Sequence, residues 1–229
     1  MNSGLIVRRR ISSDRHNQEE AAVRFLELFY PSSTSNSHVL LLSSQVQLSP
    51  HYFHFIKYAL LEYKYSSFGA FDNAGLMGIS LELPSVLLDG KTKLSPPSTG
   101  DMHTDRYEKL SPKVTSVPFM WQAPNSHATL FLGDKWAELH SFLSNRVAKH
   151  RKTTKSTSRK KLVSETLPAW TEYMLELMRV RGYSLLYPAT HSHALATIHN
   201  ELYYAPEEFT ASLTADGKES PCLLYTSLS

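Results

Sequence analysis

The run from Val39 to Leu42 constrains the fold of this chain more than any other segment. Four consecutive apolar residues, VLLL, are followed directly by the polar residues Ser43 to Gln45. A short, uninterrupted apolar run with polar flanks is typical of a buried strand. Ser49 and Pro50 then stand where an N-cap and a first helical residue belong. The order of strand, polar strand end and helix predicts an α/β fold.

The rest of the chain continues this alternation of short apolar runs and amphipathic segments. Four segments place apolar residues at helical spacing, and other apolar runs are short enough to be strands. Gly182 stands where a glycine that ends the last helix belongs. We predict Val39 to Leu42 to be a central strand. The further strands are predicted at Leu76 to Leu83, Ala128 to Leu132 and Tyr183 to Tyr187, and the helices at 17–30, 50–65, 135–147 and 168–181.

Two stretches interrupt this alternation, and both predict loops. Residues 84–118 contain five Pro and few apolar residues, which predicts a long irregular loop of functional or mobile character. Residues 148–162 lie in a basic run, Arg146 to Lys161, with eight Lys or Arg and no acid. A solvated, flexible loop is the favoured interpretation, and binding of phosphate, RNA or an anionic membrane is the alternative. Because no aromatic residues interleave with the charges, we expect no nucleic acid partner.

The composition suits one globular domain, which we place at residues 1–210. Of the 229 residues 41% are hydrophobic, and 10 Phe, 12 Tyr and 3 Trp are enough to build a core. The single cysteine, Cys222, excludes a disulfide framework and zinc sites built from cysteine. The run Cys222 to Ser227 resembles a sequencing adapter read through in one frame. We therefore expect 211–229 to be a disordered tail and 222–229 to be an artefact.

Several segments, in one order along the chain, resemble the family 2-type glycosyltransferases of GT-A fold, and fungal members in particular. The segment VLLLSSQVQLSPHYF is similar to that family's apolar strand, strand-end cluster and Val-x-x-Ser-Pro turn. The resemblance covers residues 5–210 and implies a GT-A-like mixed sheet flanked by helices. The N-terminal nucleotide-binding half would lie upstream of Met1. Its other distinctive pieces are Gly78 to Leu81, Phe119 to Gln122 with Trp136, Arg181 to Tyr183, and Tyr187-Pro188.

The resemblance implies transfer of a sugar from a nucleotide sugar to a carbohydrate or glycoconjugate acceptor. It also implies a full-length protein anchored, outside this chain, in the Golgi or ER membrane. In the family, acids at the strand end hold a divalent metal that bridges the diphosphate of the donor. Here Ser43, Ser44 and Gln45 replace them and supply no charge for Mg²⁺ or Mn²⁺. We predict no metal ligands there and expect neutral hydrogen bonds to the donor instead. Simple capping of the strand end is the alternative.

An inverting sugar transfer needs a carboxylate that takes the proton from the acceptor hydroxyl. Asp134 is the first candidate for this base, with Glu138 and Asp72 in reserve. The alternative role of Asp134 is to cap the helix that follows it. The predicted acceptor-binding residues, which could pack on a sugar or hydrogen-bond it, are Trp121, Gln122 and Trp136.

The histidines His191, His193 and His199 come close together in the sequence THSHALATIHN. Zinc requires three or four ligands with supporting partners, and no pattern here supplies them, so we predict no metal cluster. The resemblance makes His199 a donor-binding candidate. Neither a Gly-x-Ser-x-Gly elbow nor a Walker loop occurs, which argues against a serine hydrolase and a P-loop enzyme. The alternative to an enzyme is a catalytically degenerate carbohydrate-binding or scaffold module, which carboxylates lining a pocket beneath Ser43 would disfavour.

Overall fold

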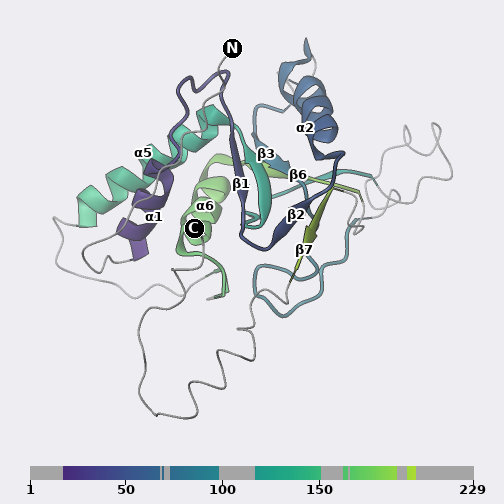
Figure 1. Ribbon diagram of the computed structural model, residues 1–229. Helices are drawn as coiled ribbons and strands as arrows, with labels where there is room; N and C mark the ends of the chain where they lie inside the picture. The colour runs from purple at the N-terminus through teal and green to yellow at the C-terminus, as the bar shows by residue number, and fades with distance from the viewer. Residues whose placement is uncertain are drawn as a thin grey trace, which may run out of the picture.

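The computed structural model describes residues 18–67, 69, 73–97, 117–150, 162–164, 166–189 and 195–199. Within these ranges the chain forms a mixed five-stranded sheet with helices on both faces (Figure 1). This arrangement confirms the predicted α/β class and the mixed sheet flanked by helices. Asp72, His191, His193 and the predicted tail at 211–229 lie outside the described residues. Among the described helices, none combines the length and apolarity that a bilayer-spanning segment needs.

The strand order of the main sheet is β1-β5-β3-β6-β4. Strands β3 and β6 pair in parallel, whereas the other neighbouring pairs are antiparallel. The prediction that Val39 to Leu42 is central is wrong, because this strand lies at an edge of the sheet and Leu42 is 43% exposed. The central strand is β3, which is buried at every position. The bounds are β1 Val39–Leu42, β3 Leu76–Ser80, β4 Phe119–Trp121, β5 Ala128–Phe131 and β6 Ser184–Tyr187.

Two further strands form a small antiparallel sheet beside the carboxyl end of β1. Strand β2, Val46–Leu48, pairs with β7, Ala196–Ile198. The backbone N–H of His199 donates to the carbonyl oxygen of Gln45 at 3.0 Å, and Ser49 N donates to Leu195 O at 2.9 Å. This pairing brings residues 195–199 to the polar segment that follows β1.

Helices α1, Gln18–Glu27, α5, Gly133–His150, and α6, Ala169–Arg181, pack over one face of the sheet. Helix α2, Tyr52–Leu60, continues into the π-helical turn η1, Leu61–Tyr65, and packs on the other face (Figure 1). All four predicted helices are confirmed, with ends shifted by a few residues. Because α5 continues to His150, the first residues of the predicted loop at 148–162 are helical; residues 151–161 lie outside the described residues.

Two helix-end predictions have different outcomes. The N-cap of α2 is His51 rather than Ser49, and the Ser49 hydroxyl instead accepts a hydrogen bond from the backbone N–H of His51 at 3.1 Å. Gly182 does end α6 in the left-handed conformation, with φ of 72° and ψ of 26°. The backbone N–H of Tyr183 closes this end by donating to Met178 O at 2.8 Å.

One ion-pair group ties the three helices of the first face together. The Arg146 guanidinium donates to Glu19 at 2.9 Å and also to Glu176, so a residue of α5 bridges α1 and α6. Phe25 of α1 stacks on Trp170 of α6 at a centroid separation of 5.5 Å. Arg146 is the first residue of the basic run in the sequence, and the structure assigns it to helix packing rather than to a solvated loop.

Two glycines should respond differently to replacement by Ala. Gly182→Ala is expected to cost about 1 kcal/mol, because its positive φ disfavours a side chain, although no described atom lies within 4 Å of where the added Cβ would be. Gly78→Ala is expected to cost more, because its Cβ would clash with the carbonyl oxygen of Leu130 in the centre of the sheet. Urea unfolding of both variants measures the two costs, and equal values would contradict this ranking.

Candidate functional site

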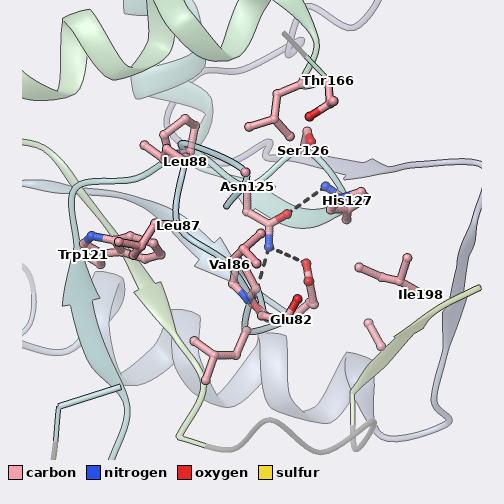
Figure 2. Close-up of a pocket in the computed structure, with 17 residues that line it drawn as sticks. Glu82, Val86, Leu87, Leu88, Trp121, Asn125, Ser126, His127, Thr166 and Ile198 are labelled. Carbon is pink, nitrogen blue, oxygen red and sulfur yellow. Dashed lines mark hydrogen bonds between the residues drawn. The ribbon is translucent and has the colours of Figure 1, made fainter. Parts of the chain in front are cut away.

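A pocket of about 430 Å³ lies where the carboxyl end of β3 meets the start of β5 (Figure 2). The antiparallel pairing of these two strands places the residues that follow β3 beside those that precede β5. Residues 82–88 and 124–127 form most of the wall, and Ala196 and Ile198 of β7 contribute from the small sheet. Open α/β sheets commonly bind ligands outside the carboxyl ends of their strands, and this pocket has that position.

The side chains of Glu82 and Asn125 form the polar centre of the pocket. Asn125 Nδ2 donates to Glu82 Oε2 at 2.8 Å and to Ser80 Oγ at 2.9 Å, and its Oδ1 accepts from the backbone N–H of His127 at 2.8 Å. Asn125 is only 2% exposed. Burial raises the pKa of the Glu82 carboxyl, and the hydrogen bond from Asn125 opposes this shift in part. The result is an oriented carboxyl group that holds its proton more tightly than an exposed glutamate.

Tyr187 supports this centre from strand β6. Its hydroxyl donates to the carbonyl oxygen of Ala123 at 2.9 Å, which fixes the segment that leads to Asn125. Its ring lies 5.2 Å from that of Trp121, measured between centroids, and Trp121 lines the pocket. Burial, together with the nearby Glu82 carboxyl, raises the pKa of Tyr187 well above its usual value, so the phenol stays protonated as a donor.

His127 connects the pocket with the polar strand end at Ser43 to Gln45, which is predicted to bind the donor. Its Nδ1 lies 3.4 Å from Ser43 Oγ, and its carbonyl oxygen accepts from Ser43 N at 2.7 Å. Burial lowers the pKa of His127, which favours the neutral imidazole. Ser43, Ser44 and Gln45 thus lie next to the pocket, but they are not among the residues that line it.

The four predicted donor-binding residues lie together. His199 reaches Gln45 through its backbone N–H, and its Nε2 lies 2.7 Å from Gln47 Oε1. Gln45 is buried, and its Oε1 has no hydrogen-bond partner among the described residues. Within that same part of the chain, no three His, Cys, Asp or Glu side chains are grouped so that they could hold a metal ion.

The predicted catalytic acids lie elsewhere. Asp134 follows the opposite end of β5 from the pocket, and its carboxylate pairs with Lys64 Nζ at 3.4 Å. Glu138 pairs with Arg181 at 2.8 Å and accepts a hydrogen bond from the Tyr183 hydroxyl at 2.7 Å. Neither acid lines the pocket. The structure therefore places neither carboxylate in the pocket that Trp121, a predicted acceptor-binding residue, lines.

The predicted acceptor-binding residues are divided between pocket and core. Trp121 lines the pocket, whereas Gln122 Nε2 donates to Met178 O at 3.4 Å. Trp136 is 0% exposed and packs against Phe131 inside the helical layer, so it does not reach a ligand. The helical spacing of Trp136 and Leu139 explains this burial, because both belong to the apolar face of α5.

Sequence reasoning missed Glu82, Asn125 and His127 as site residues. Glu82 carried a usable signal, because an acid that ends an apolar strand just before Pro84 occupies the position where α/β sheets bind ligands. Asn125 and His127 precede β5 in a segment without a recognisable motif. Their role depends on the pairing of β5 with β3, which brings residues 43 positions apart within hydrogen-bond distance.

No family model, curated protein or solved structure matches this chain. The resemblance to family 2-type glycosyltransferases therefore stays a prediction carried by the residues quoted above.

Proposed function

We propose that this chain belongs to a glycosyltransferase that moves a sugar from a nucleotide sugar to a hydroxyl of a carbohydrate or glycoconjugate. The observation that carries the proposal is the Glu82 carboxyl, oriented by Asn125 in a pocket that Trp121 also lines. The GT-A identity of the sheet, and action of the full-length protein at the Golgi or ER membrane, belong to the same proposal and rest on the resemblance. Glu82 replaces Asp134 as the proposed base because Glu82 lines the pocket.

The proposed chemistry is an inverting substitution at the anomeric carbon of the donor. The acceptor oxygen forms a bond to that carbon as the bond between the carbon and the diphosphate oxygen breaks. The acceptor proton passes to the Glu82 carboxylate, and the nucleoside diphosphate leaves with the bonding electrons. A base whose pKa is raised toward the working pH is effective in such a step. The half-buried ring of Trp121 provides a surface on which a sugar ring can pack.

The positions of the predicted donor-binding residues support this proposal. Ser43 contacts His127 at the edge of the pocket, and His199 contacts Gln45 beside it. A donor held along this polar segment would present its sugar to an acceptor at Glu82. Hydroxyl, amide and neutral imidazole groups can hydrogen-bond ribose and phosphate oxygens without a formal charge.

A transfer assay with a panel of nucleotide sugars and simple glycan acceptors tests this function. We expect release of nucleoside diphosphate together with a product whose mass is increased by one sugar. Glycan binding without either product would favour the second candidate, a catalytically degenerate carbohydrate-binding or scaffold module of the same fold. Neither binding nor transfer with any pair in the panel would count against both candidates.

Turnover is expected to persist in excess EDTA. The strand end that holds a metal in the apparent relatives consists here of Ser43, Ser44 and Gln45, which offer a hard divalent ion no negative charge. Turnover measured with and without chelator checks this expectation, and Ser43→Asp serves as a comparison that should gain a response to Mn²⁺. Complete loss of turnover in EDTA, restored by Mn²⁺, would show that other residues form a metal site.

A further inference from the structure

The pocket around Glu82 suits an acceptor better than a nucleotide, and its walls indicate what kind of acceptor. We propose that it binds an uncharged glycoside that carries an apolar group close to the reacting hydroxyl. This inference rests on the proposed function, because it names the acceptor class for the same site. It goes beyond the resemblance, which implies only a carbohydrate or glycoconjugate acceptor.

The charge at the centre of the pocket disfavours a diphosphate. The ionised Glu82 carboxylate, the form that acts as the base, carries a charge of the same sign as the phosphate groups of a nucleotide. Their repulsion grows in a partly buried site, where the effective dielectric constant is low. Burial also lowers the pKa of His127 and so weakens its ability to offset that charge as a cation. A neutral hydroxyl avoids this repulsion and can donate its proton to the Glu82 carboxylate.

The walls of the pocket provide apolar surface on two sides of this polar centre. In Figure 2, Leu87 lies with Trp121 on one side of the Glu82 and Asn125 side chains, and Ile198 lies on the other. Val86 also lines the pocket and is 38% exposed, so part of its surface remains available to a ligand. A sugar that packs on Trp121 and hydrogen-bonds at the centre would still leave Val86 and Ile198 in water.

An apolar substituent on the sugar would cover this surface. Each methylene group that leaves water for an apolar wall is expected to raise the affinity about fourfold, until the pocket is filled. The volume of about 430 Å³ lies at the lower end of the range of small-molecule sites, which suits one sugar ring with a short substituent. The expected ligand is therefore amphiphilic, with its reacting hydroxyl at Glu82, its sugar ring on the side of Leu87 and Trp121, and its apolar substituent at Val86 and Ile198.

Calorimetric titration with the methyl, butyl and hexyl glycosides of glucose, galactose and mannose tests the inference. Each glycoside is used below the concentration at which it forms micelles. For at least one of the sugars, affinity should increase by about fourfold for each added methylene. Uridine and guanosine diphosphate, with and without Mg²⁺, should not displace the hexyl glycoside. Val86→Ser and, as a second variant, Ile198→Thr should each reduce the dependence on chain length. Val180→Ser, at a 71% exposed position on α6, is the matched control and should leave the dependence of affinity on chain length unchanged.

The outcomes separate this inference from the proposed function. Affinity that is independent of chain length, or displacement of the hexyl glycoside by a nucleoside diphosphate, would overturn the inference even if methyl glycosides accept sugar in the transfer assay. If affinity increases with chain length but no sugar is transferred, the ligand class is supported and the proposed transferase function is contradicted. Increasing affinity that persists in both pocket variants would place the apolar contact elsewhere and also overturn the inference.

Discussion

Glu82→Gln is expected to lower turnover by about 100- to 10,000-fold, the usual contribution of a general base. Gln has the shape of Glu, and its amide oxygen can still accept the hydrogen bond from Asn125 Nδ2. What the variant loses is the carboxylate that receives the acceptor proton. Initial rates at saturating donor and acceptor measure the effect, with Glu62→Gln on the exposed side of η1 as the matched control.

The pH dependence separates a catalytic role of Glu82 from a structural one. Because burial raises its pKa, the folded protein binds this proton more tightly than the unfolded chain does. The stability contributed by this group is therefore present below the ordinary glutamate pKa of 4.5 and is lost as the pH rises through the raised folded pKa. Turnover should increase over that same rise, since the base must be ionised.

Above that pH window, Glu82→Gln should melt at the same temperature as the unsubstituted protein or higher. Melting curves from mildly acidic to mildly alkaline pH measure this comparison. If the variant loses turnover and its melting temperature is also much lower at every pH, Glu82 stabilises the fold rather than acting as the base. A variant that keeps turnover would remove Glu82 from the mechanism.

Trp136→Ala is expected to destabilise the fold by about 3–5 kcal/mol, which lowers the melting temperature by roughly 6–20 °C for a domain of this size. The indole is 0% exposed, with its centroid 5.3 Å from the ring of Phe131 and 6.3 Å from that of Phe25. Removing it leaves a cavity where α1, α5 and the sheet meet. Thermal and urea unfolding measure the loss.

Two comparisons make the Trp136 result specific. Trp136→Phe should cost less, because it keeps most of the volume and removes an indole N–H that has no hydrogen-bond partner among the described residues. Trp121→Ala, at the half-buried wall of the pocket, should destabilise the protein less and should weaken glycoside binding. If Trp121→Ala proved the more destabilising of the two Trp→Ala variants, the assignment of one indole to the core and the other to the pocket would be wrong.

The sequence was sufficient to predict the α/β class, the four helices and the strand at Val39 to Leu42. Each helix and strand depends on a pattern among neighbouring residues, and the class follows from their alternation along the chain. The spacing of Trp136, Leu139 and Leu143, for example, defines the face of α5 that is buried. Gly182 likewise carries a local signal, because a left-handed residue at a helix end favours glycine.

Strand order and the candidate site were decided by tertiary structure. The run VLLL indicates burial but cannot show whether one strand or two will pair with it. Among the described strands β1 has a partner on one side only, β5. Asp134 and Glu82 are both acids near the ends of predicted strands, yet pairing places Asp134 beside Lys64 and Glu82 beside Asn125. These pairs lie 70 and 43 residues apart in sequence. A local pattern predicts which face of a helix or strand is buried. The choice of its partner strand or side chain depends on free energies summed over contacts between distant segments.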